Sequence, residues 1–331
     1  MNPGGHRNTA PESVAITADA AKLSDLGRRL RSLHNGDGAV IEAIGIGAPA
    51  IPVLRALLFE RDPSGIFEPR MRAAQALAAL RATSELKEFV REWKSASDPV
   101  ERFGDEAVLG AVARFLGATM EEDVYDILMA IGRKHPVPGV IEALGRYGRS
   151  ESVSIMLRAL ADDISRTAAE QALRILGEAG VPALIEAAMR PVANFWGREI
   201  PSSVLRRRSA LMLLLEFGVT RDIWDRIRRL VSDSDDEISV RACAIGLTAG
   251  TGSHQRDCAW RMVELLRGVA WPLHQEIEDY LIDNFAIARE FVDQAIKRPM
   301  DDIADDFARA RFKRSLRRIA ARALTRQAPG S

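Results

Sequence analysis

The residues whose spacing could hold a metal ion are His254 and Cys258, which lie four positions apart and would share one face of a helix. Asp257 lies beside them and His274 follows further along the chain. A structural zinc centre uses four ligands, and a Gly-Ser-His-Gln stretch at the start of a helix is commonly solvated, so we predict no metal site. The other histidines are scattered and are interpreted as turn or surface residues: His6, His34 and His135.

The sequence also contains no convincing active-site motif. Glu276, Asp279 and Asp283 fall on one helical face, but paired catalytic acids need an apolar pocket, and a solvated face explains these three. The glycines at 45 and 47 begin like a dinucleotide fingerprint, yet no strand pattern precedes them and Pro49 follows. Neither a nucleophile elbow nor a phosphate-binding loop occurs. We therefore predict no catalytic residue and no cofactor, and the sequence favours a non-enzymatic protein.

The elements that carry these residues are helices from about residue 20 to 325, separated by short Gly, Pro, Ser or Asp segments, with no alternating strand pattern. One kind of segment opens with a proline in a small, apolar setting and recurs at 47–51, 136–140 and 180–184. Proline is tolerated in the first turn of a helix, where its missing N–H has no intrahelical partner. These segments predict tight connections between antiparallel helices.

A second kind of segment is an arginine followed by small and aliphatic residues, at 72–77, 166–173, 208–211 and 240–245. The alanines allow neighbouring helices to approach closely, and the Leu and Ile residues fill the groove between them. The acidic run 232–237 precedes the last of these segments and is predicted to cap the start of its helix.

This combination resembles the HEAT-repeat family, whose units carry a Pro-containing turn and an Asp…Val-Arg…Ala…Leu pattern. The pattern is most complete at Asp236, Val240, Arg241, Ala242 and Leu247, and the resemblance is clearest over 36–250. It implies an all-α solenoid of stacked antiparallel helix pairs and implies almost nothing about activity.

Two kinds of enzyme use related repeats, the alkylpurine DNA glycosylases and the bilin lyases. The glycosylase resemblance would require a Trp, an Asp and an Arg that point together at a flipped base. Trp224, Asp225 and Arg226 are adjacent in sequence and point to different sides of a helix, so we assign no catalytic residue on this basis.

Insertions in a helical stack emerge as loops, and such loops often make contacts. Two stand out, at 61–70 and 190–201. The second contains Phe195, Trp196 and Arg198, residue types that anchor interfaces, and these are the candidate partner-binding residues. The alternative is that Phe195 and Trp196 cover the end of a neighbouring helix, as large aromatic residues usually do.

The segment 301–326 is predicted to be one basic amphipathic helix with four aspartates in its first turns. Its candidate basic residues are Arg309, Arg311, Lys313, Arg314, Arg317, Arg318, Arg322 and Arg326. Positions 312, 316, 319 and 323 form an apolar stripe. This stripe could seal the end of the stack, or the helix could bind nucleic acid, an anionic membrane or an acidic protein.

The predicted organisation is a disordered tail at 1–19, a solenoid at 20–300, the basic helix at 301–326 and a flexible tail at 327–331. Two cysteines give no disulfide framework, and the N-terminus lacks the apolar core of a signal peptide, so we predict a cytoplasmic protein. The longest apolar run, 210–215, is too short to cross a membrane.

The 331 residues carry 46 basic and 46 acidic side chains, and ten of the basic ones lie at 297–326 against four acidic ones. The remainder is mildly acidic, which argues against duplex binding along the whole stack. The leading hypothesis is a non-enzymatic scaffold that binds another protein. The alternative is a nucleic-acid-binding protein that uses the basic helix, including a repair enzyme of the glycosylase kind. Nothing in the sequence indicates the oligomeric state.

Overall fold

The computed structural model describes residues 11–32, 34–298 and 305–327. The chain divides into two compact units. The first comprises Met1–Met156 with Ile164–Ile175, and the second comprises Leu157–Asp163 with Leu176–Ser331. The repeat pattern, which predicts one solenoid over 20–300, does not indicate this division.

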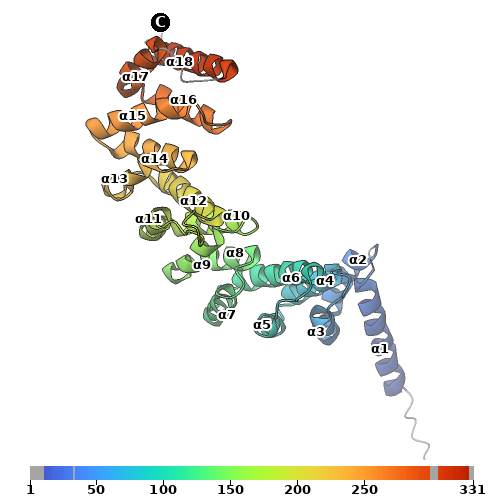
Figure 1. The fold of residues 1–331 in the computed structure, drawn as a ribbon. Coiled ribbons are helices and arrows are strands. Elements are labelled where there is room, and N and C mark those ends of the chain that lie inside the picture. Colours follow the sequence, from blue (N-terminus) through green and yellow to red (C-terminus); the bar gives the residue numbers. More distant parts are fainter. Residues whose placement is uncertain (1–10, 33, 299–304, 328–331) are drawn as a thin grey trace, which may run out of the picture. The chain divides into compact units, whose positions relative to one another are not determined.

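In the first unit the helices alternate between two layers (Figure 1). One layer contains α2 (Gly36–Ile46), α4 (Glu68–Ala79), α6 (Pro99–Gly117) and α8 (Pro138–Tyr147). The other contains α3 (Ile51–Phe59), α5 (Thr83–Glu92) and α7 (Glu122–Gly132). Helix α1 (Pro11–Leu30) packs against α2 and α3, and α9 (Val153–Ala159) and α10 (Arg166–Leu176) follow α8 in the chain. The unit is a stack of antiparallel helix pairs, as the sequence predicts.

The second unit repeats the alternation. Helices α12 (Pro201–Phe217), α14 (Asp236–Ala249), α16 (Leu273–Asp283) and α18 (Asp306–Gln327) succeed one another in one layer. In the other layer α11 (Val181–Met189) packs against α13 (Arg221–Ile227), and α15 (Ser253–Leu265) packs against α17 (Phe285–Lys297). The all-α fold class is therefore confirmed. Among the described residues there is no β-strand, and an isolated bridge joins Ala193 to Glu199.

The helix starts follow the sequence signals. Pro49 lies in the short 3₁₀ turn between α2 and α3, Pro138 is the first residue of α8, and Pro182 lies in the first turn of α11. The acidic run also acts as predicted, because the Asp235 side chain accepts a hydrogen bond from the backbone N–H of Ile238 and so caps α14.

Two arginines of the repeated motif, Arg72 and Arg208, pair with acids of the adjacent repeat. Arg72 Nε lies 3.0 Å from Asp37 Oδ1, and Arg208 Nε lies 3.0 Å from Asp235 Oδ1. Arg241 donates to the backbone carbonyl of Arg208 over 2.8 Å and also pairs with Glu237 of its own helix. These arginines belong to the packing between repeats and do not form an open phosphate-binding row.

Glycines bring α6 and α8 into backbone contact. A Cβ atom added at Gly139 would lie 2.1 Å from the carbonyl oxygen of Gly110, and one added at Gly117 would lie 2.7 Å from the Cβ of Ala143. Because no side chain separates the helix axes at these points, the two helices pack more closely than Leu or Val would allow. This contact fixes the spacing of the repeats around residues 110–143.

The terminal helices begin and end at residues that differ from the predicted bounds. Helix α1 begins at Pro11, within the segment 1–19 that the sequence predicts to be a disordered tail. Helix α18 begins at Asp306 and ends at Gln327, while the start of the predicted 301–326 helix, residues 301–304, lies outside the described residues. The residues predicted to form tails at 1–10 and 328–331 also lie outside them.

A search of the described helices for a segment long and apolar enough to cross a membrane finds none.

Candidate functional site

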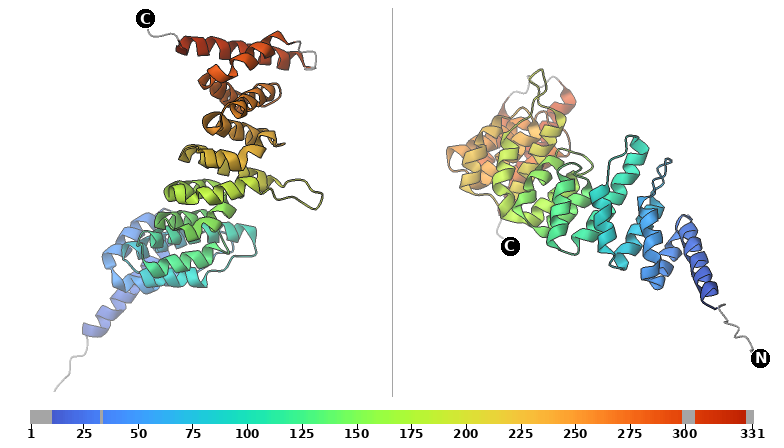
Figure 2. Two further views of the ribbon diagram at one scale, coloured as in Figure 1. Left: turned by 90° about the vertical axis from the view of Figure 1, so that its left-hand side faces the viewer. Right: turned by 90° about the horizontal axis from the view of Figure 1, so that it is seen from below.

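The insertion between α11 and α12 folds back on itself as a short hairpin, here called the 190–200 hairpin. The backbone N–H of Asn194 donates to the carbonyl oxygen of Arg198 over 2.7 Å, and the N–H of Gly197 donates to the carbonyl of Asn194 over 3.0 Å. Gly197 has a φ of +75°, which glycine adopts without steric cost. A three-residue loop closed by a left-handed glycine is a common hairpin connection. Figure 2 shows the hairpin as the green-to-yellow loop that projects from the helices of the second unit.

The side chain of Asn194 fixes the tip of this hairpin. Its Oδ1 atom accepts hydrogen bonds from the backbone N–H groups of Trp196, over 3.0 Å, and Arg198, over 3.1 Å. Asparagine commonly stabilises turns in this way. The backbone of the tip is therefore already ordered before any partner binds, which lowers the entropy cost of binding.

The two aromatic side chains at the tip are exposed. Phe195 is 96% exposed and Trp196 is 79% exposed, the two highest values among the large apolar side chains of the described residues. Their rings meet edge to face, with centroids 6.2 Å apart. The alternative that these rings cover the end of a neighbouring helix is therefore wrong. Arg198 is also exposed, and it forms no salt bridge within the described part of the chain.

A buried arginine holds the base of the hairpin. Arg207 on α12 is 2% exposed, and its guanidinium binds Glu199 of the hairpin over 2.6 Å, Asp233 before α14 over 2.5 Å and the carbonyl of Ala188 over 2.8 Å. Glu199 also accepts a hydrogen bond from Ser203 over 2.6 Å. Because a buried ion must keep its partners, this network ties the hairpin to the helices on both sides of it.

Helix α18 packs against α16 and α17 through its apolar stripe. Phe312, Leu316, Ile319 and Ala323 are all fully buried. The stripe is thus occupied by contacts within the unit and is not available for insertion into a membrane.

The predicted basic residues of α18 divide into two groups. Arg311 donates to the carbonyl of Val269 over 3.3 Å, Arg318 binds Glu278, and Arg309 lies 3.1 Å from Asp306. The remaining cations are exposed and form no salt bridge in the part of the chain that the structure describes: Lys313, Arg314, Arg317 and Arg322. The Arg326 side chain lies outside the described side chains.

A polar cluster that the sequence pattern does not predict joins α16 to α18. Ser315 Oγ lies 3.4 Å from His274 Nε2, and His274 Nδ1 lies 3.4 Å from Glu278 Oε1. This connectivity is that of a serine, histidine and acid relay. However, the three residues are only 1–2% exposed, so no substrate can reach Ser315 in this conformation. Burial lowers the pKa of His274. The cluster is the polar part of the contact that holds α18 in place.

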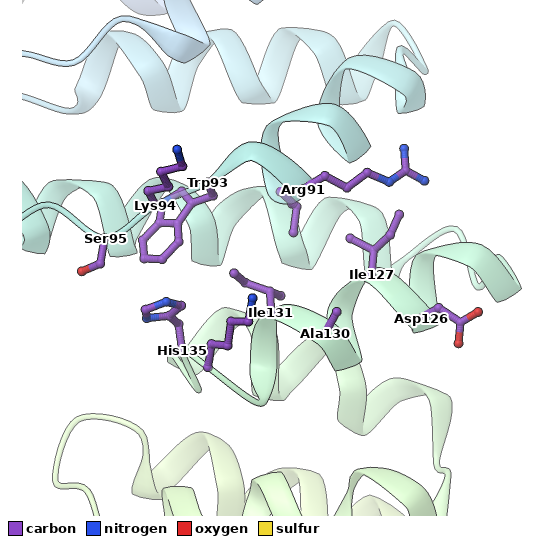
Figure 3. A pocket seen from close by; sticks show the side chains of 11 residues that line it. Arg91, Trp93, Lys94, Ser95, Asp126, Ile127, Ala130, Ile131 and His135 are labelled. Atoms are coloured by element: carbon purple, nitrogen blue, oxygen red, sulfur yellow. The ribbon is translucent and has the colours of Figure 1, made fainter.

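The first unit contains a cavity of about 630 Å³ beside the C-terminal ends of α5 and α7, here called the Trp93 cavity. Figure 3 shows the Trp93 and His135 side chains facing each other, with Ile131 beside them and Ile127 and Ala130 further along α7. The Trp93 and His135 ring centroids are 4.7 Å apart. His135 lies in the turn after α7, as the sequence indicates, but its ring contributes to a cavity wall that the sequence did not predict.

Other residues singled out in the sequence do not come together as a site. Trp224 is buried, whereas Asp225 and Arg226 are exposed, so they do not form a base-binding set. Cys258 is buried, and the ring of His254 packs against Trp224 with centroids 5.8 Å apart. The three carboxylates of the predicted solvated face are exposed: Glu276, Asp279 and Asp283.

No protein-family model matches this sequence, and no curated protein matches it. Among solved structures, the chain is similar to YibA of Escherichia coli, with 16% identity, 87% of this chain and 96% of that chain covered, and a TM-score of 0.41. It is similar to a chain of the CpcE and CpcF complex of phycocyanin lyase from a Nostoc species, with 18% identity over 88% of this chain and 99% of that chain and a TM-score of 0.32. It is also similar to human deoxyhypusine hydroxylase, with 13% identity over 84% of this chain and 99% of that chain and a TM-score of 0.28. At these levels the similarities assign no function.

Proposed function

We propose that this chain is a protein-binding module and that the 190–200 hairpin is its principal contact element. The observation that carries the proposal is the exposure of Phe195 and Trp196 on a turn whose backbone is already hydrogen-bonded. Exposing two large aromatic rings costs solubility, and aromatic residues are the side chains that most often dominate the binding energy of interfaces. A partner that covers both rings would bury them without having to order the loop.

Arg198 extends the same surface with a positive charge. Because it follows Trp196 by two residues in the same hairpin and forms no salt bridge within the described residues, it can pair with a carboxylate at the rim of an interface. The expected partner surface is therefore an apolar depression that accepts two rings, with an acidic residue at its edge.

The test starts from affinity purification of the tagged protein from its own cells, with and without nuclease. A partner that is retained after nuclease treatment is then titrated against the wild type and the double variant Phe195→Ala/Trp196→Ala. We expect the double variant to bind at least about 30-fold more weakly, since each ring is a candidate hot spot.

The matched control is Phe307→Ala, which removes an aromatic ring that is 75% exposed on α18 of the same unit. This variant should bind the partner as the wild type does. Equal binding by the wild type and the double hairpin variant would contradict the proposal.

A second candidate function is nucleic-acid binding by α18. Lys313, Arg314 and Arg317 favour it, because they are exposed and form no salt bridge among the described residues. They lie within little more than one helical turn, so they could neutralise phosphates of a single strand. Recovery of nucleic acid in the purification, and its loss when all three are changed to Gln, would place this function ahead of protein binding.

A further inference from the structure

A groove of about 280 Å³ lies on the layer of the first unit that contains α4, α6 and α8, and it is here called the Phe103 groove. All the residues that line it belong to the first unit. Gly110 and Gly139, at the backbone contact between α6 and α8, are two of them, so no side chain fills the groove there. Met71 of α4 and Phe103 of α6 line it as well.

Exposed apolar side chains border this groove. Phe103 is exposed on α6, and Ile164, in the turn before α10, is 73% exposed. Val100 lies one helical turn before Phe103 and is also exposed, so the apolar surface continues beyond the groove. The ring of Phe67, from the insertion at 61–70, packs edge to face on that of Phe103 with centroids 6.0 Å apart. Exposed apolar side chains that gather around a groove are typical of surfaces that bind another protein.

The groove also carries an acid, Glu106, which forms no salt bridge among the described residues. Arg114 lines the groove too, but it is paired with Glu142 over 2.5 Å. Arg102, one turn before Glu106, donates to two backbone carbonyls instead. Burial lowers the pKa of the nearby His135 more than the charge of Glu106 raises it, so this ring is neutral at pH 7. The groove therefore presents one negative charge beside its apolar surface.

The 190–200 hairpin has the complementary chemistry. Phe195 and Trp196 are exposed at its tip, and Arg198 forms no salt bridge among the described residues. The surface that such a hairpin fits is an apolar depression with an acidic residue at its edge. Each copy of the chain carries one such depression in its first unit and one hairpin in its second unit.

We propose that the hairpin of one copy of this protein docks into the Phe103 groove of a second copy, with its two rings against Phe103 and Ile164. Arg198 of the hairpin would then lie beside Glu106. This inference rests on the proposed function, because it identifies the partner of the hairpin as a second copy of the chain.

The size of the contact sets the expected affinity. Each aromatic ring buries about 150–250 Å², so one hairpin in one groove would cover roughly 600–1,000 Å² on the two copies together. This is the low end of the range for specific interfaces, so we expect reversible self-association with a dissociation constant in the micromolar range.

The experiment is sedimentation velocity of the full chain from about 1 to 200 µM, a range that brackets micromolar dissociation constants. We expect the mean sedimentation coefficient to rise with concentration. An end point at the dimer indicates that two copies exchange hairpins, and larger species indicate a head-to-tail contact. Both results support the proposal.

Two variants each remove one side of the contact. Phe195→Ala/Trp196→Ala removes the rings and should raise the dissociation constant at least about 30-fold. Ile164→Lys places a cation in the groove, where it would repel Arg198, and should also prevent association. The matched control is Ile41→Lys on α2 of the same unit, because Ile41 is 74% exposed and does not line the groove. The control should associate as the wild type does.

Mixing the two variants tests the contact directly. The hairpin variant keeps an intact groove and the groove variant keeps an intact hairpin, so an equimolar mixture should associate although neither variant does so alone. Loss of the fold in either variant would not produce this rescue.

Charge reversal provides an independent test of orientation. Arg198→Glu and Glu106→Lys should each weaken self-association by about two- to tenfold, and the double variant should recover most of the loss. Two single effects that simply add in the double variant would contradict the pairing of these residues.

Three results would overturn the proposal: a wild type that stays monomeric up to about 200 µM, self-association that survives either contact variant, and a mixture of the two variants that does not associate. The purification from cells distinguishes such a failure from a failure of the proposed function. If the chain is monomeric but another protein is retained by the wild type and lost by the double hairpin variant, the hairpin binds that protein and only the present inference is wrong.

Discussion

Replacing Gly139 by Ala tests whether the backbone contact between α6 and α8 is as close as the structure indicates. The added Cβ would lie 2.1 Å from the carbonyl oxygen of Gly110 and 2.4 Å from its Cα, and side-chain Cβ atoms essentially never lie closer than 3.0 Å to other atoms. The helices must therefore separate by most of an ångström, because both opposing atoms belong to the backbone and cannot rotate away. Overpacking of this kind costs about 1–3 kcal/mol.

A helical Gly→Ala change without a clash acts in the opposite direction. It stabilises a helix by up to about 1 kcal/mol, because alanine has less backbone freedom to lose. Gly45 in α2 supplies this control, since a Cβ added there would meet nothing within 4 Å. We expect Gly139→Ala to lower the free energy of unfolding by about 1–2 kcal/mol after this gain is subtracted, and Gly45→Ala to raise it.

The assay is urea unfolding followed by circular dichroism, with the midpoint compared at unchanged slope. The two substitutions are chemically identical, so any difference in sign comes from the surroundings of each site. If Gly139→Ala is as stable as Gly45→Ala, the close approach of α6 and α8 is refuted.

Three further changes test the second unit. Leu316→Ala empties a fully buried site where α18 packs and should cost about 2–5 kcal/mol, with loss of amide-exchange protection in α18, whereas Leu324→Ala at an exposed site should change stability by less than about 0.5 kcal/mol. Arg207→Met removes the buried partner of two acids, so it should cost about 3–5 kcal/mol in urea unfolding and increase amide exchange in the hairpin. Burial holds the pKa of His274 below its ordinary value of about 6.5, so the unfolded state binds the proton more readily and stability should fall as pH drops below that value. His274→Gln should flatten this dependence between about pH 7 and 5.5, and an unchanged slope would contradict the cause assigned to it.

The features that the sequence predicts correctly depend on short stretches of chain. Asp235 caps α14 because its side chain reaches the N–H group three residues ahead of it, and Pro138 begins α8 because its fixed φ suits a first helical turn. The apolar stripe of α18 is equally local, since residues 312, 316, 319 and 323 share one helical face whatever they pack against. In each case the deciding interaction lies within one helix or one turn.

The features that the sequence does not predict depend on residues that are far apart along the chain. Trp93 and His135 come from successive repeats, and only the stacking of α5 and α7 brings their rings together. The exposure of Trp196 is another such feature, because a Pro- and Gly-bounded loop can either fold over a helix end or project from it. The hydrogen bonds of Asn194 and the ion pairs of the buried Arg207 make this loop project, and the composition of the loop predicts neither of them.

The basic character of α18 illustrates how far composition can mislead. The sequence shows a run of cations, but the structure uses Arg318 to bind the buried Glu278 and Arg311 to bind a carbonyl, so those two belong to helix docking. The α18 cations that can meet a ligand are those that form no salt bridge among the described residues: Lys313, Arg314, Arg317 and Arg322. The number of basic residues in the sequence therefore overestimates the size of a cationic binding surface. Only the basic residues that have no intramolecular partner can contribute to it.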